Sequence, residues 1–187
     1  MQPEASPISR SVAPAAIQRQ EGSTTVTINL GAVRNGTYNV TGADFTAAGN
    51  QMNARGEWGL GGARNIRGTP GTADADGILQ NVTVTAELFT RLPNWTRLAG
   101  KPEPVRNEWN RMLAALRGHE NHHVSIARTH LDALETTLSG IHEDDFQRVW
   151  GEAIAGLQTA QQDYDDTTHS GQDEGVTLDL NVEEQDE

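Results

Sequence analysis

The 187-residue chain contains no cysteine. This absence excludes a disulfide framework, a thiol nucleophile and every zinc or iron–sulfur site built on cysteine, so a bound metal ion would need histidine or carboxylate ligands. Lysine is nearly absent too, because Lys101 is the single lysine and the thirteen arginines are scattered along the sequence. With a formal net charge of −12, this composition argues against nucleic acid as a partner through a basic face.

Apolar sequence is also scarce. Hydrophobic residues make up 35% of the chain, below the usual share for a globular domain, which predicts that part of it is not packed. There is no run of 18 apolar residues, and the first twenty residues lack the apolar stretch of a signal peptide. We therefore expect no membrane span and no recognisable signal peptide, and the cellular location stays open.

The two ends differ in composition from the middle. Residues 1–22 are rich in Pro, Ala, Ser and Gln and predict a disordered or loosely packed arm, whereas residues 181–187 predict an acidic tail. The length allows one domain between flexible ends, which we place at residues 23–180.

Alternating apolar and polar residues predict a small antiparallel sheet. Residues 24–41 alternate on either side of Asn35-Gly36, a dipeptide typical of tight turns, and so predict a hairpin. Residues 82–88 predict a third strand, which we expect Pro93 to end.

A short helix and a glycine-rich segment are expected between these strands. Residues 43–54 have helical periodicity, and either Thr41 or Asp44 could cap the helix. Residues 55–77 contain seven glycines and little periodicity, which predicts either a long loop or an irregular strand. We expect this segment to act as a lid or as a wall of a cleft.

The second half of the chain follows a helical period. Apolar residues recur at steps of three and four over residues 105–138 and again over residues 143–164. The short link at Gly140 makes the two helices an antiparallel pair. The predicted class is α+β, in which a small antiparallel sheet with a short helix is followed by a long antiparallel helical hairpin.

Residues 119–123 read HENHH and satisfy the pattern H-E-x-x-H. On a helix, His119 and His123 lie one turn apart and can bind one Zn²⁺, while Glu120 can act as a general base on water. Both Glu120 and His123 fall on the apolar stripe of the predicted helix, where an unpaired carboxylate costs stability. The alternative is a solvated helix face on which the histidines fall by chance.

A catalytic zinc ion requires a third protein ligand. The short-spaced metzincin arrangement is excluded, because Ile126 and Thr129 stand where Gly and His are required. Glu143 would be roughly 20 Å from the motif along the hairpin, and Glu152 points away from the apolar stripe. His169 follows the second helix where the chain returns to the level of the motif, so we expect it to be the third ligand.

Two residues near the end of the second helix are candidates for supporting roles. Tyr164 is a candidate catalytic donor to the oxyanion, although a tyrosine on an apolar stripe is more often part of the core. Asp165 could orient a ligating imidazole, or it could simply be an acid at a helix end. The remaining histidines, at positions 122, 130 and 142, are expected on the surface or beside the site.

With these residues the chain resembles a bacterial family identified as secreted zinc-dependent proteases, a domain of unknown function with an H-E-x-x-H helix. The resemblance covers roughly residues 36–171 and rests on HENHH together with positions 38–42, 92–95, 109, 164–165 and 168–169. It implies a zincin-like metallopeptidase fold that acts on peptide or protein substrates. It further implies zinc on His119, His123 and His169, with Glu120 as base. The sequence departs from those family members that carry cysteines and a signal peptide.

A short segment of the N-terminal arm, Ala-Ile-Gln-Arg-Gln at residues 16–20, is similar to segments of bacterial proteins linked to contractile injection systems. This similarity implies a secretion or injection apparatus as a partner, and a generic linker explains the segment equally well. Two functions follow from the sequence. One is a zinc metalloprotease that hydrolyses peptide bonds, and the other is a non-catalytic, metal-stabilised binding or structural module, such as a cargo or effector of such an apparatus.

Overall fold

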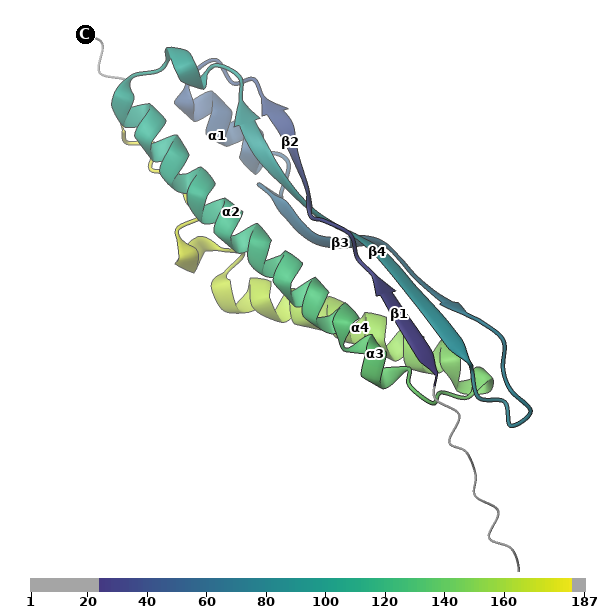
Figure 1. Ribbon diagram of the computed structural model, residues 1–187. Coiled ribbons are helices and arrows are strands. Elements are labelled where there is room, and N and C mark those ends of the chain that lie inside the picture. Colours follow the sequence, from purple (N-terminus) through teal and green to yellow (C-terminus); the bar gives the residue numbers. More distant parts are fainter. Residues whose placement is uncertain (1–23, 183–187) are drawn as a thin grey trace, which may run out of the picture.

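The computed structural model describes residues 24–182 and shows a mixed α/β protein, in which a twisted sheet runs along one long helix (Figure 1). The predicted arm at residues 1–22, with its segment similar to injection-system proteins, lies outside the described residues, as do residues 183–187 of the acidic tail. The strands are β1 (Thr25–Asn29), β2 (Arg34–Val40), β3 (Leu60–Pro70) and β4 (Asn81–Trp95). The helices are α1 (Phe45–Asn53), α2 (Glu103–Asp132), α3 (Leu134–Thr137) and α4 (Glu143–Thr168), with short 3₁₀ turns η1 (Leu98–Gly100) and η2 (Gln172–Glu174).

The central strand of the sheet is β4. Strands β1 and β2 both pair with it in parallel, one with its first half and the other with its second half, while β3 pairs with it antiparallel along the opposite edge. The predicted all-antiparallel sheet and the hairpin over residues 24–41 are therefore wrong, and Asn35-Gly36 lies inside β2. Alternation reports only which face of a strand is buried, and it is the same for parallel and antiparallel neighbours.

Of the two alternatives for residues 55–77, the structure has the irregular strand over the middle of the segment, because β3 spans Leu60–Pro70 and its register shifts between Arg64 and Arg67. Its glycines allow the strand to lie against the helices. A β-carbon at Gly61 would collide with the backbone of Glu120 on α2, and one at Gly68 would collide with the indole of Trp150 on α4. Glycine here permits close approach of a strand, and not a turn.

Pro93 does not end the strand that contains it, contrary to the sequence prediction, because β4 continues to Trp95. Pairing of β3 with β4 reaches only as far as Arg91. From Pro93 onward β4 therefore has a strand on one side only, which is where a sheet tolerates proline.

The helices follow the sequence pattern closely. The predicted short helix is present as α1, and the side chain of Asp44 caps it by accepting a hydrogen bond of 2.7 Å from the backbone N–H of Ala47. The long helix expected over residues 105–138 is broken at Ala133 into α2 and α3. Helix α4 begins at Glu143 as predicted and returns antiparallel beside α2 (Figure 1).

Two apolar clusters form the core. The first contains Val82, Leu88 and Val124, and the second contains Trp95, Trp109 and Leu116. On α2, Leu116 and Val124 flank HENHH, so the polar motif occupies the gap between the two clusters. None of the described helices is both long enough and apolar enough to cross a membrane.

Candidate metal centre

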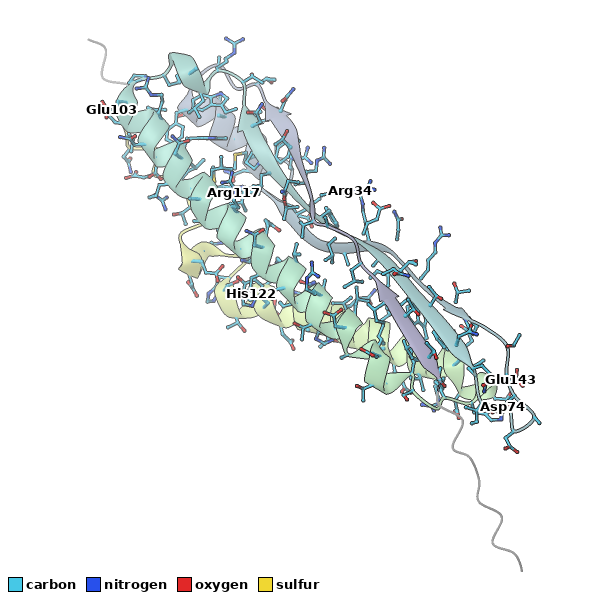
Figure 2. The ribbon with its side chains drawn as sticks, in the orientation of Figure 1. Arg34, Asp74, Glu103, Arg117, His122 and Glu143 are labelled. Carbon is cyan, nitrogen blue, oxygen red and sulfur yellow. The ribbon has the colours of Figure 1, made fainter. Side chains whose placement is uncertain are left out.

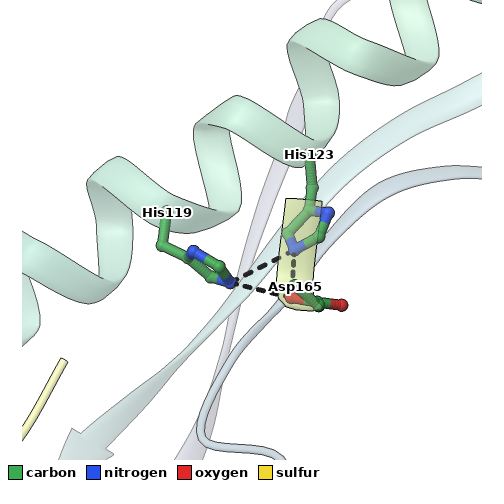
Figure 3. Close-up of side chains that lie close together, drawn as sticks. All are labelled: His119, His123 and Asp165. Carbon is green, nitrogen blue, oxygen red and sulfur yellow. Dashed lines mark hydrogen bonds and ion pairs between the residues drawn. The ribbon is translucent and has the colours of Figure 1, made fainter. Parts of the chain in front are cut away.

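Three ligand atoms converge between α2 and α4 (Figure 3). The Nε2 atoms of His119 and His123 are 3.2 Å apart, and they lie 3.2 and 3.0 Å, respectively, from Oδ1 of Asp165. A tetrahedral zinc ion with ligands at about 2.0–2.1 Å would hold its ligand atoms about 3.3 Å apart. The group can therefore hold a metal ion, and its imidazole and carboxylate donors fit zinc as well as other divalent ions.

Each histidine ring is held from its far side. Nδ1 of His119 lies 2.9 Å from Oε2 of Glu174, and Nδ1 of His123 is hydrogen bonded to Oε1 of Gln161. Gln161 also donates to the backbone carbonyl of His123 at 3.0 Å, which fixes its amide. When both Nδ1 atoms donate to oxygen, both Nε2 atoms carry a lone pair toward the position between the rings.

Glu120 lies beside this group and is 4% exposed. It lines a cleft of about 990 Å³ together with both histidines and Asp165. Burial, with repulsion from Asp165 and Glu57, raises the pKa of the Glu120 carboxyl to about 8. The loop before β3 lies directly against this carboxylate at Gly59, where an added β-carbon would force the Glu120 side chain to shift.

His169 is not brought to the metal-binding group. It ends α4 in the left-handed backbone conformation, its side chain is 70% exposed, and its Nδ1 lies 2.7 Å from Oδ2 of Asp173. The pairs 119 with 165 and 123 with 161 are both centred on residue 142, whereas the sequence prediction centred the bend near residue 140. The shift places Asp165, and not Gln161, opposite His119. Helix α4 also continues to Thr168, about one turn beyond its predicted end at Tyr164, and this extra turn carries His169 past the level of the motif.

Tyr164 has a different environment from the one expected of an oxyanion donor. Its ring stacks against His119 and His122, with ring centres 4.9 and 4.2 Å away. Its hydroxyl donates to Glu174 at 2.8 Å, and burial together with this carboxylate raises the pKa of Tyr164 above its ordinary value. In this structure the hydroxyl thus supports the carboxylate that holds His119.

Gln161 and Glu174 were missed by the sequence reasoning. Gln161 lies one turn before Asp165 on α4, so a helical projection anchored on Asp165 would have found it. Glu174 lies in η2, beyond the end of α4, where no periodicity applies.

We expect Glu174→Ala to weaken zinc binding by roughly 10–100-fold, because the ring of His119 would lose the carboxylate that orients it. Glu174→Gln should retain most of the affinity, since the amide oxygen can still accept from Nδ1. Competition with a chromophoric chelator measures both, and Asp173→Asn is the matched control in the same turn. An equal loss of zinc affinity in Asp173→Asn and Glu174→Ala would contradict this role of the Glu174 carboxylate and would show that any change in η2 disturbs the site.

The fold and the site together define a mixed α/β protein with a two-histidine, one-aspartate candidate metal centre. Residues 36–172 match the family described as "Bacterial protein of unknown function (DUF922)", and the chain belongs to this family. The match contains the whole HENHH motif and Asp165, and it ends before Glu174. No curated protein and no solved structure gives a significant match to the chain.

Proposed function

We propose that the protein is a zinc-dependent metallopeptidase. The observation that carries this proposal is the triangle of His119, His123 and Asp165, with ligand atoms 3.0–3.2 Å apart, beside the buried carboxylate of Glu120 in a cleft. Three protein ligands with room for a fourth are typical of catalytic zinc, whereas structural zinc is usually enclosed by four.

The chain supplies the remaining parts of a hydrolytic site. Zinc, when bound, supplies Lewis-acid polarisation of the scissile carbonyl and activation of water. Glu120 accepts the proton of the attacking water and passes it to the leaving amine. Glu174 and Gln161 orient the two imidazoles, so that little reorganisation is needed when substrate binds.

An extended polypeptide suits the shape of this cleft. Strand β3 lines it, pairs with β4 along one edge, and has no described strand on its other edge. A substrate backbone can add to such an edge through main-chain hydrogen bonds. The described cleft residues include the carboxylates of Glu57 and Glu120 but no arginine or lysine, which favours neutral and basic peptides over acidic ones.

Glu120→Gln tests this function. We expect the native zinc-loaded protein to cleave members of a library of neutral and basic peptides, and Glu120→Gln to lose roughly 100-fold or more of that activity because it lacks the base. Mass spectrometry of the products measures cleavage, and elemental analysis checks that the variant still binds zinc.

The rival function, a metal-stabilised binding or structural module, predicts a different result. Native protein and Glu120→Gln would both bind zinc, and both would leave the whole library intact. Cleavage that is equal in the two proteins would instead indicate a contaminating peptidase and would also remove support for the proposal.

A further inference from the structure

Over β1, β3 and the first half of β4, the sheet has one face that none of the described helices covers. Toward the ends of β2 and β4 the twist turns this face inward, and Tyr38 and Trp95 are buried there in the second apolar cluster. Helices α2 and α4 pack on the inner face, where Val84 and Leu88 of β4 are fully buried. On the opposite face, which we call the outer face, the strand pairing places Phe89 between Arg34 of β2 and Gly62 of β3, and Arg64 beside Glu87. Figure 2 shows Arg34 on the side of the sheet away from α2.

Arginines that are scattered in the sequence gather on this outer face. They come from three strands: Arg34 lies on β2, Arg64 and Arg67 lie on β3, and Arg91 lies on β4. Among the described strand residues of the outer face, Glu87 is the single acid. The face is thus strongly cationic in a chain whose formal net charge is −12, a segregation that creates a local field opposite to that of the whole molecule.

Aromatic rings restrain several of these cations without neutralising them. The guanidinium of Arg64 lies 5.0 Å from the centre of the Phe89 ring, and that of Arg91 lies 5.6 Å from the Tyr38 ring. The guanidinium of Arg55, in the loop before β3, lies 4.0 Å from the centre of the same Tyr38 ring. Stacked guanidinium groups keep their charge and their donors available to a further partner.

Glu87 shows which chemistry the face accepts. Its carboxylate accepts hydrogen bonds from Arg64 at 3.1 Å and from Asn65 at 3.2 Å, and it lies 3.8 Å from Arg34. These contacts hold the pKa of Glu87 below its ordinary value. Beside it, a depression of about 350 Å³ is lined by Arg34, Arg64 and Arg91, with Phe89 as an apolar contact.

The spacing of the arginines favours a polypeptide over a single small anion as the ligand of this face. The arginines are distributed over three strands, and neighbouring strands lie about 4.8 Å apart, so one phosphate could not reach them all. Several carboxylates carried at intervals on an extended chain could meet them, while apolar residues between the carboxylates pack on Phe89. We propose that the outer face binds an extended, carboxylate-rich segment of a partner protein.

Binding of labelled poly-L-glutamate tests this proposal by fluorescence anisotropy. Native protein should bind the probe at low ionic strength, although the net charges of both molecules repel, and added salt should weaken binding. Arg64→Gln with Arg91→Gln should weaken binding by about tenfold or more, whereas Arg128→Gln with Arg148→Gln on the helices removes the same charge and should have little effect.

Several results would overturn the proposal. They are no binding by native protein, equal weakening in the two double variants, and displacement of the probe by inorganic phosphate at matched ionic strength. Tighter binding of RNA or of phosphatidylserine vesicles than of poly-L-glutamate would assign the face to another partner. If Arg64→Gln with Arg91→Gln fails to fold by circular dichroism, Arg34→Gln with Arg67→Gln takes its place.

The binding test is independent of the proposed peptidase function. It is performed with a chelator present, and Glu120→Gln should bind the probe as native protein does. A failed peptidase assay therefore leaves the binding result unaffected, and the reverse also holds.

Discussion

Replacing Asp165 by Asn is expected to lower zinc affinity by at least roughly 100-fold. This is more than the usual loss when a residue that only hydrogen-bonds to a metal-binding side chain is replaced. The substitution removes the charged oxygen that lies 3.0 Å from His123 and 3.2 Å from His119, while leaving the shape of the side chain unchanged. It also leaves two neutral imidazoles to hold a dication alone. Competition titration of the metal-free protein with a chromophoric chelator measures the affinity.

His169→Ala is the matched control, because the sequence prediction made His169 the third ligand. Its side chain is 70% exposed and contacts Asp173 on the surface, so we expect unchanged zinc affinity in this variant. The opposite pattern, with affinity lost in His169→Ala and retained in Asp165→Asn, would overturn the ligand set and return His169 to the site.

The residues of the HENHH motif and the third candidate ligand differ in how far the sequence could predict them. That His119 and His123 lie together could be predicted because their spacing is fixed inside one helix, where a turn takes 3.6 residues. The role of Glu120 as a base stays a prediction. The third candidate ligand depends on how two helices align, and that alignment depends on the bend and on where the second helix ends. The bend centred on residue 142 and the extension of α4 to Thr168 were not visible in the periodicity. Together they place Asp165 beside His119 and leave His169 about one turn beyond it.

The fold shows the same division between local and long-range information. The start of α4 near Glu143 and a cap of α1 at Thr41 or Asp44 could be predicted because they depend on adjacent residues, and the structure has Asp44 as the cap. For the segment that contains β3, the sequence could not decide between a loop and an irregular strand, because its glycines are typical of loops but here admit the backbone of Glu120 and the ring of Trp150. The pairing of β1 and β2 with one long central strand depends on contacts more than fifty residues apart along the chain, and alternation carries no information on such pairing.

The cationic outer face could not be predicted from the sequence, because its arginines are spread evenly along the chain. Arg34, Arg64 and Arg91 are roughly thirty residues apart in sequence and gave no basic cluster. Register in the sheet brings them around Phe89. The sequence argument against a basic face therefore holds for the chain as a whole and misses the local field that folding creates.

Glu120→Gln is expected to stabilise the metal-free protein at alkaline pH. The folded carboxyl has a pKa of about 8 against an ordinary value of 4.5, mainly because it is buried. The unfolded chain releases this proton near pH 4.5 and the folded protein only near pH 8, so stability falls as pH rises through this window and the loss is complete above it. At 4% exposure little solvent screening applies, and the loss is at most about 5 kcal/mol.

Urea unfolding with a chelator, at pH 5 and at pH 9, measures the effect. We expect native protein and Glu120→Gln to differ little at pH 5, and the variant to be more stable by a few kcal/mol at pH 9, because glutamine has no proton to lose. Glu135→Gln, an exposed change on α3, should alter neither value. A stability difference that is equal at the two pH values would mean that packing, and not the raised pKa of Glu120, separates the two proteins.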